Sequence, residues 1–370
     1  MTIMQKTLPK GWKMVRLGDE KVVQIIMGQS PPSSSYNAEG IGLPFYQGKA
    51  EFGEHHPKTV KWCSQYGKIA EADDILMSVR APVGDVNICK EKSCIGRGLT
   101  AIRINRASLN NKFLYYFLKR DTSIWNKLST GSTFDSITSK TLRSLPIPLP
   151  PLPTQHKIVE ILEEADNLRR LRQQADEKMK DLIPSLFVQM FGDPVKNPKG
   201  WKVKRLGDLC EFVYGDSLPE KKRKNGDVAV YGSNGIVGKH DAAITENETI
   251  IIGRKGSVGE VNFSPTPCFP IDTTYFIDRR YTKQNLVWLF WLLKFLELER
   301  LSLMVGVPGL NRHHAHDLKT IVPPLPLQQE FAKMVEDIEA EKARQVESRK
   351  KLDELFQSLM QRAFTGELVS

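Results

Sequence analysis

Apolar and polar residues alternate between residues 148 and 191 with the spacing of one face of an α-helix. A proline-rich lead-in is followed by apolar residues three or four positions apart, which on a helix form one narrow seam. Thr154 is the expected N-cap, and Gly192 followed by Pro194 marks the expected end. At ~1.5 Å per residue this helix is roughly 50 Å long, and it is too charged outside its seam for an ordinary core helix. The seam comprises Ile158, Ile161, Leu162, Ala165, Leu168, Arg172, Ala175, Met179, Leu182 and Leu186.

The same arrangement returns at the end of the chain, where a second proline-rich lead-in at 323–327 precedes apolar positions at helical spacing. Neither helix can bury a one-sided seam alone, so we expect the two to pack against each other as an antiparallel pair. Pro184 in the first helix and the polar stretch 339–350 in the second predict an interrupted contact or a third partner along the pair. The second seam comprises Phe331, Val335, Ile338, Leu352, Leu355, Leu359 and Phe364, and the helix is expected to end at Thr365-Gly366.

The chain also repeats itself, which indicates two domains of one architecture. Four segments recur in order: 11–19 as 200–208, 75–87 as 250–262, 114–119 as 289–294, and 131–137 as 306–312. Each proline-rich entry with its helix follows its own copy. We therefore expect four parts: a first domain at 1–150, a central long helix at 151–193, a second domain at 194–325, and a distal long helix at 326–370.

Each domain is expected to be a mixed α+β structure rich in short strands. Runs of β-branched residues bounded by Gly, Pro, Asn and Asp predict strands at 75–79, 86–88, 100–104, 249–252 and 274–277. Segments 109–128 and 285–303 are apolar on most sides, which predicts helices packed into each domain. Trp12 and Trp201, one at each domain entry, are expected to have structural roles. The overall prediction is two mixed α/β domains related by a pseudo-twofold axis, separated by two long antiparallel helices that form a coiled-coil-like spacer.

Composition favours a nucleic-acid partner. The 370 residues have a formal net charge of +10 and an isoelectric point near 9.2, which leaves an excess of Lys and Arg. Mean hydropathy is −0.34, and neither a membrane-spanning apolar run nor a signal-peptide core is present. The five cysteines are scattered without zinc-ligand spacing, so we expect reduced thiols in a cytoplasmic protein.

The sequence offers little support for catalysis. Ser30-Pro-Pro-Ser33 lacks the amide or carboxylate and the aromatic residue of a methyltransferase motif. The glycine-rich run 253–259 lacks the ending of a phosphate loop, and a β-hairpin is the favoured interpretation. His313, His314 and His316 have no Cys or carboxylate partner at metal-ligand spacing, which favours a polar surface turn or DNA-facing histidines. We expect no catalytic residue, no metal and no cofactor in this chain.

Polar residues in the loops of the repeat are the candidates for DNA recognition. Arg, Asn, Gln and Ser have donor–acceptor geometries that match base edges, and Lys suits phosphates. Arg80 and Arg254 are favoured because they recur at hairpin tips that the repeat makes equivalent. The full set is Gln29, Ser30, Tyr46, Gln47, Lys49, Arg80, Ser132, Thr133, Tyr231, Ser233, Asn234, Arg254, Lys255, Asn311, Arg312 and His313.

These motifs, in this order, resemble the specificity (S) subunit of type I restriction–modification systems. The resemblance rests on two copies of Gly-Trp-Lys-x-x-x-Leu-Gly-Asp, the Arg-x-x-Val-Gly hairpin, Gly-Ser-Thr-Phe, Gly-Leu-Asn-Arg, and Pro-Leu-Pro followed by Gln-x-x-Ile-Val. It implies that each domain is a target recognition domain that reads one half of a split double-stranded DNA site. It also implies that the helices set the spacer and dock two modification (M) subunits, which restriction (R) subunits join. S-adenosylmethionine would then belong to the M subunit, and ATP and Mg to the R subunit.

Other functions stay open at this point. One is a two-domain scaffold that binds no DNA, and another is the specificity subunit of a different split-site system. A self-contained methyltransferase or nuclease is disfavoured by the missing motifs. If the helices act as a ruler, inserting about four residues, one helical turn, into the first helix lengthens the unread spacer.

Overall fold

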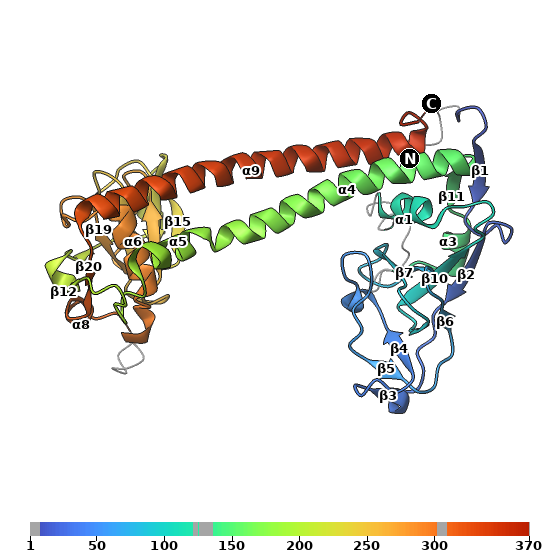
Figure 1. Cartoon of the computed structure of the whole chain (residues 1–370), viewed down its shortest axis with the longest axis horizontal. Helices are drawn as coiled ribbons and strands as arrows, with labels where there is room; N and C mark the ends of the chain where they lie inside the picture. Colours follow the sequence, from blue (N-terminus) through green and yellow to red (C-terminus); the bar gives the residue numbers. More distant parts are fainter. Residues whose placement is uncertain (1–7, 121–124, 126–135, 302–308, 370) are drawn as a thin grey trace. The chain divides into compact units, whose positions relative to one another are not determined.

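The computed structural model describes residues 8–120, 125, 136–301 and 309–369. The chain divides into two compact units, Met1–Arg172 with Ser348–Ser370, and Gln173–Glu347. Figure 1 follows the chain through both. Two long helices, α4 (Leu152–Lys180) and α9 (Leu325–Thr365), each contribute residues to both units.

The first unit is built on a four-stranded antiparallel sheet with the strand order β2-β10-β7-β8. A second sheet of short strands has the order β3-β5-β4-β9-β6, and β1 pairs with β11. The strands are β1 (Lys13–Arg16), β2 (Val23–Met27), β3 (Tyr36–Asn37), β4 (Leu43–Tyr46), β5 (Trp62–Cys63), β6 (Ile69–Ala70), β7 (Ile75–Ser78), β8 (Val86–Ile88), β9 (Ser93–Ile95), β10 (Leu99–Ile104) and β11 (Pro146–Leu149). The shorter helices are α1 (Asn111–Lys119) and α3 (Ser139–Arg143).

The second unit repeats this plan with a smaller second sheet. Its main sheet has the order β13-β19-β16-β17, the smaller one β15-β14-β18, and β12 pairs with β20. The strands are β12 (Lys202–Arg205), β13 (Val213–Tyr214), β14 (Val228–Gly232), β15 (Gly235–His240), β16 (Thr249–Gly253), β17 (Val261–Ser264), β18 (Phe269–Pro270), β19 (Thr274–Ile277) and β20 (Lys319–Val322). The shorter helices are α5 (Leu182–Phe191), α6 (Leu286–Phe295) and α8 (Arg312–His316). The predicted repeat is therefore present in the topology, and the 253–259 run is a hairpin turn as predicted.

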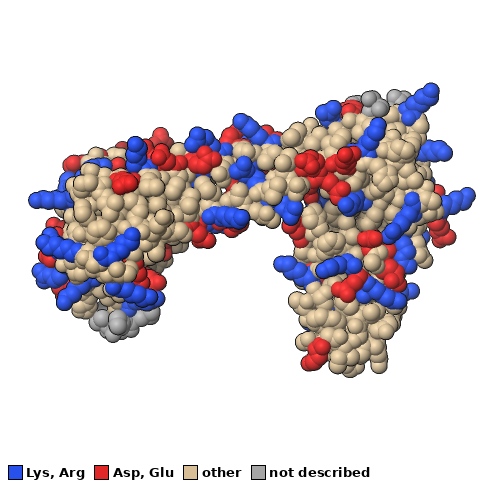
Figure 2. Space-filling view, viewed as in Figure 1, with Lys and Arg blue, Asp and Glu red and all other residues tan. Residues whose placement is uncertain are grey.

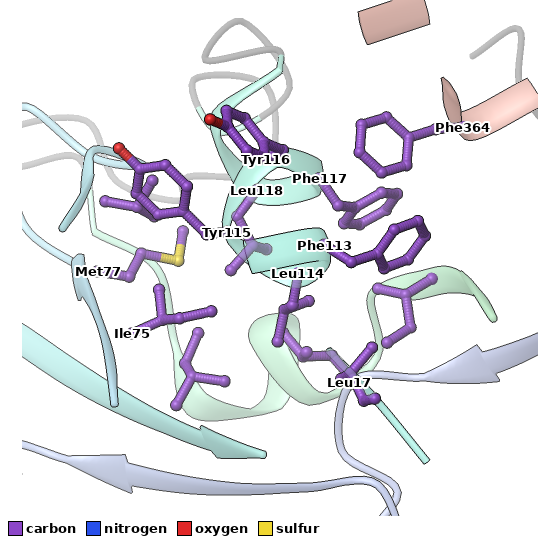
Figure 3. Packing of buried hydrophobic residues seen from close by; sticks show 14 of the residues in the cluster. Leu17, Ile75, Met77, Phe113, Leu114, Tyr115, Tyr116, Phe117, Leu118 and Phe364 are labelled. Atoms are coloured by element: carbon purple, nitrogen blue, oxygen red, sulfur yellow. The ribbon is translucent and has the colours of Figure 1, made fainter. Parts of the chain in front are cut away.

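Helix α1 organises the core of the first unit because its residues 113–118 are all buried. Figure 3 shows Tyr115 directed toward Met77 of the sheet, while Phe113 and Phe117 face Phe364 of α9. The ring centroids of Phe113 and Phe117 lie 5.2 and 5.3 Å from that of Phe364. An apolar helix packed on two sides is what the sequence predicted for this segment. It joins the sheet to the end of α9.

A buried glutamine at the start of each long helix attaches that helix to its own domain. Gln155 Oε1 accepts a hydrogen bond from the backbone N–H of Asn110 at 2.7 Å, and its Nε2 donates to two backbone carbonyls. Gln328 accepts from the N–H of Asn285 at 3.0 Å in the same way. Asn110 and Asn285 are in turn the N-caps of α1 and α6. Each glutamine therefore fixes the first turn of a domain helix to a long helix.

The long helices differ in detail from their predicted course. Helix α4 begins at Leu152, two residues before the expected N-cap Thr154, because a proline is tolerated in the first turn. It ends at Lys180, and Pro184 lies in the first turn of α5, so the predicted kink is a break at Asp181. The ends at Gly192 and Gly366 are confirmed, and both glycines have the left-handed φ typical of a helix C-terminus, +78° and +79°.

The predicted seams are only partly buried. Ile158, Leu162 and Ala165 of α4 pack with Phe356 and Met360 of α9 in the first unit. In the second unit the break shifts the buried face of α5 to Ile183, Phe187 and Phe191. The helices also expose apolar side chains, and two of these, Leu168 and Leu182, were predicted to lie in the seam of the first helix. The exposed apolar residues of the helices are Leu168, Leu171, Leu182, Val188, Leu325, Met334, Val346 and Leu355.

Candidate nucleic-acid interface

Loops that follow strands of both larger sheets enclose an open hollow of about 670 Å³ in the first unit. Gln47 follows β4, Arg80 follows β7, and Arg97 lies in the turn between β9 and β10. The loops approach closely at Gly98, where a Cβ would stand 2.4 Å from the carbonyl oxygen of Gln47. The other lining residues are Gly48, Lys49, Ala50, Glu51, Ala81 and Pro82.

The hollow carries more positive than negative charge. Lys49, Arg80 and Arg97 line it with one carboxylate, that of Glu51. Lys49 Nζ lies 2.8 Å from the carboxylate of Asp85. Arg80 and Arg97 are exposed, and neither forms an ion pair with another residue that the structure describes. Their guanidinium groups can therefore meet a phosphate or the edge of a base.

The loop after β2 joins this region through Arg97. The N–H of Gln29 donates to the carbonyl of Ile95 at 3.0 Å, and Ser30 Oγ accepts from the N–H of Arg97 at 3.2 Å. Gln29 is exposed and Ser30 is half-buried. The structure thus brings together five predicted residues of the first unit: Gln29, Ser30, Gln47, Lys49 and Arg80.

Two predicted residues, Tyr46 and Tyr231, lie in the interior. Only 1% and 7% of their surfaces are exposed. Tyr46 shares a hydrogen bond of 2.9 Å with Thr59, and burial raises the pKa of its hydroxyl. Tyr231 packs against Ile251 and Cys268. Both rings support their sheets, so the surface proposed below to contact DNA leaves them out. The predicted Ser132 and Thr133 lie outside the described residues.

In the second unit, predicted residues from three segments gather around one turn. The carbonyl of Thr273 accepts hydrogen bonds from Ser233 Oγ at 2.8 Å, from the N–H of Arg254 at 2.9 Å and from that of Lys255 at 3.1 Å. The carbonyl of Arg254 accepts from the N–H of Leu310 at 2.9 Å, which attaches the loop before α8. The structure thereby brings together Ser233, Asn234, Arg254, Lys255, Asn311, Arg312 and His313.

Two arginines of this group lie over one exposed aromatic ring. The guanidinium carbons of Arg254 and Arg312 lie 5.2 and 5.3 Å from the ring centroid of Tyr214, which is 48% exposed. Tyr275 packs against Tyr214 with centroids 5.0 Å apart and donates to the carbonyl of Leu310. Burial is the main cause that raises the pKa of Tyr275 to about 12, so it stays a donor at neutral pH.

The register corrects the equivalence that favoured Arg80 and Arg254. Ser78 pairs with Leu99, and Gly253 pairs with Thr274 at the same place in the second sheet. The next residue is Val79 in the first unit and Arg254 in the second. The one after it is Arg80 in the first unit and Lys255 in the second. Arg80 therefore corresponds to Lys255, and the counterpart of Arg254 is a valine that is 3% exposed. A basic residue recurs at one position of the hairpin, but Arg254 belongs to the second unit alone.

His316 supports the interface through a hydrogen bond from the backbone of Phe212, and it is expected to make the stability of the second unit sensitive to pH. Its Nε2 accepts a hydrogen bond from the N–H of Phe212 at 3.2 Å, which requires a neutral ring. Burial, with a smaller effect of Arg312, lowers its pKa from the ordinary 6.5. The unfolded chain therefore takes up the proton first as pH falls, and stability is lost below about pH 6.5.

We expect the free energy of unfolding of the second unit to fall between about pH 7.5 and about pH 5.5. The matched variant is His316→Gln, whose amide oxygen can still accept from Phe212 but does not titrate. Thermal unfolding across this range should show a weaker pH dependence for the variant. Equal dependence in both proteins would contradict the assignment.

Sequence reasoning missed Arg97 and Tyr214. Arg97 lies between two glycines, a pattern typical of a tight turn whose middle side chain points outward. Tyr214 is the last residue of a two-residue strand, too short to be recognised by periodicity. The only available signal was their place in the sequence. Arg97 follows the strand β9 and Tyr214 ends the strand β13, and both strands have predicted loops as neighbours.

The described residues contain no group of three or more His, Cys, Asp or Glu side chains that could hold a metal ion. A second hollow of about 330 Å³ in the first unit is lined by the residues of two ion pairs, Arg103 with Asp74 and Arg106 with Asp73. Within the described part of the chain, no helix combines the length and apolar character that a bilayer crossing requires.

Surface charge differs between the two units on the face shown in Figure 2. Lys and Arg gather over the part of the second unit that carries β12, β20 and α8. The part of the first unit that carries β3, β4 and β5 shows almost no charged atoms on this face. Exposed basic residues on β12 and β20 are Lys202, Lys204, Arg205 and Lys319. This surface of the second unit is suited to phosphates.

The sequence model of one protein family, the type I restriction modification DNA specificity domain, matches residues 9–180 and 198–355, which is most of the chain. The chain belongs to this family. Each matched segment begins just before the first strand of one repeat and runs into the long helix that follows it.

Specificity subunits are also found among individual relatives. A Methanocaldococcus jannaschii protein assigned as the specificity subunit of the type I restriction enzyme MjaX is 47% identical over 184 residues, 49% of this chain and 43% of that protein. The MjaIX specificity subunit of the same organism is 26% identical over 90% of this chain and 87% of its own length. The chain thus spans less than half of the first relative and most of the second.

Two solved structures of specificity subunits share the fold. The S subunit from M. genitalium superposes with a TM-score of 0.60 at 19% identity, over 98% of this chain and 97% of its own. The HsdS subunit from Thermoanaerobacter tengcongensis gives 0.53 at 20% identity over the full length of both chains. At these identities the similarity concerns the fold alone, and it agrees with two mixed α/β domains joined by long helices.

Proposed function

We propose that this chain is the DNA-specificity subunit of a type I restriction–modification complex, in which each unit reads one half of a split site. The observation that carries the proposal is that one repeated scaffold presents exposed basic and polar side chains from corresponding loops in both units. Side chains of these types recognise base edges and phosphates. Membership of the family supports this function over a scaffold that binds no DNA. The long helices connect the units and set the number of unread base pairs.

Modification subunits dock on the long helices, and restriction subunits join them. The exposed apolar side chains of α4, α5 and α9 support this role, because apolar residues left in water along a helix are suited to a partner's helix. Two modification subunits fit a chain that carries its scaffold twice. This function places the complex in the cytoplasm, where the DNA is.

Chemistry belongs to the partners. The modification subunit binds S-adenosylmethionine and methylates an adenine flipped out of the duplex, and the restriction subunit uses ATP and Mg. The chain itself is not a catalyst. Its contribution is to hold the duplex in register so that each partner meets the target base.

The test is to co-express the chain with the methyltransferase subunit encoded beside it and to sequence the methylated DNA. We expect adenine methylation in both halves of a split motif, and none when the chain is omitted. Copurification of the two proteins without a split methylated motif would contradict sequence recognition. Methylation by the chain alone would contradict the division of labour.

A further inference from the structure

Tyr214, Arg254 and Arg312 form one cluster in the second unit, with both guanidinium groups over the tyrosine ring. We infer that Tyr214 is a positioning residue that holds both guanidinium groups for bidentate contacts with guanine edges in the second half-site. The inference rests on the proposed function and adds to it a named set of residues and a base type.

Both arginines are held in place before any ligand binds. Arg254 Nη2 donates to the carbonyl of Asp272 at 2.8 Å, and Arg312 Nη1 donates to that of Phe212 at 3.4 Å. Both lie over the ring of Tyr214, whose π face attracts a cation. Each guanidinium thus has two fixed contacts and further N–H groups without a described partner. Such a held, planar fork matches the O6 and N7 acceptors of guanine.

The ring of Tyr214 is itself fixed. It packs against Tyr275, whose hydroxyl donates to the carbonyl of Leu310 at 3.0 Å, and Leu310 donates in turn to the carbonyl of Arg254. The strand position also restrains it, because Tyr214 pairs with Tyr275 across β13 and β19. Backbone and side chain therefore hold one geometry, as base recognition needs.

None of the three residues recurs at the corresponding position of the first unit. Tyr214 corresponds to Met27, since these residues pair with Tyr275 and Thr100 at the same place in the two sheets. Arg254 corresponds to the buried Val79. Arg312 corresponds to Ser139, because each is the first residue after the N-cap of its short helix. This corrects the predicted match of 131–137 with 306–312 by two residues, since Ile137 donates to the carbonyl of Val79 as Leu310 donates to that of Arg254.

Residues that hold the scaffold recur in both units, as the glutamines at the starts of α4 and α9 do. The cluster does not recur, although it lies among loops that do. In a protein that reads two different half-sites, side chains that differ on an unchanged scaffold are where the choice of base is made. General phosphate contacts are provided instead by exposed lysines such as Lys255.

The experiment uses the chain co-expressed with its methyltransferase subunit, with the methylated motif as the readout. Tyr214→Leu removes the π face, Tyr214→Phe keeps it, and Arg254→Lys and Arg312→Lys keep the charge but lose the fork. The matched control is Tyr281→Leu, because Arg280 lies 5.3 Å from the ring centroid of Tyr281 in the same unit but pairs with Asp278.

We expect Tyr214→Leu to reduce the preference for guanine at one or two positions of the second half-site by about 10-fold or more, with the first half-site unchanged. Each lysine variant should relax one guanine position, while Tyr214→Phe and Tyr281→Leu should keep the original motif. Because Tyr214 is half exposed, the variant is expected to fold, and the lysine variants test the inference independently.

An unchanged motif in Tyr214→Leu and in both lysine variants overturns the inference and leaves the proposed function intact. A uniform loss of methylation without relaxed positions also overturns it, since that is the signature of phosphate contacts. So does an original second half-site without a G·C pair. If the unaltered chain yields no split methylated motif, the proposed function fails, and the inference fails with it.

Discussion

Replacing Phe187 with alanine is expected to lower the free energy of unfolding of the second unit by about 3–5 kcal/mol. The ring is fully buried where α5 meets α6 and α9. Its centroid lies 4.7 Å from that of Phe295, 5.0 Å from Phe191 and 5.6 Å from Phe331. Three rings from three helices enclose it, so the cavity left by truncation cannot close without moving a helix.

Hydrogen exchange followed by mass spectrometry can measure this effect unit by unit. Protection should fall in peptides of the second unit and stay unchanged in those of the first. The control is Val188→Ala on the same helix, which is 45% exposed and should change the free energy by about 0.5 kcal/mol or less. An equal loss in both units would contradict the division of the chain into two separately packed cores.

Replacing Gln328 with leucine should lower the free energy of unfolding of the second unit by about 3 kcal/mol. The side chain is fully buried and makes three hydrogen bonds. Leucine fills a similar volume but leaves the N–H of Asn285, the carbonyl of Pro323 and Oε1 of Gln284 without this partner. Buried polar groups deprived of a partner cost more than the bonds contribute net.

The neighbouring Gln329 provides the control, because it is exposed and its replacement with leucine should be nearly neutral. Gln155→Leu should produce the matching loss in the first unit. Urea unfolding with the same peptide-resolved exchange measures both. If Gln328→Leu left the free energy of unfolding unchanged, the hydrogen bonds of Gln328 would not be what holds the domain to α9.

Much of the fold follows from local sequence signals. The strands at β7, β8, β10, β16 and β19 are β-branched runs, and the ends at Gly192 and Gly366 follow from helix-terminating glycines. The repeat was visible because its structural residues recur at nearly constant spacing. Trp12 and Trp201 have structural roles, as expected. Trp12 lies in the core of the first unit, and Trp201 Nε1 donates a hydrogen bond to the carbonyl of Phe191.

The candidate interface was less predictable, because it depends on long-range hydrogen bonds. Nothing local to Ser233 or Arg254 shows that both bond to the carbonyl of Thr273. Burial of Tyr46 depends on its neighbours in a sheet. The equivalence of Arg80 and Arg254, in contrast, was one residue out of step with the repeat itself, because segments 75–87 and 250–262 have equal length and pair Arg80 with Lys255. The break at Asp181 was expected as a kink, since proline shows where a helix is disturbed but not how.

The central claim is that the two units read separate half-sites. The most direct test replaces Arg80 with alanine in the complex with the methyltransferase subunit and compares the methylated motif with that of the unaltered chain. Lys90→Ala is the control, because Lys90 is exposed but lies outside the residues that line the hollow. We predict that Arg80→Ala changes the recognised bases in one half of the motif and leaves the other half intact. A change in both halves, or an unchanged motif at undiminished methylation, would contradict the claim.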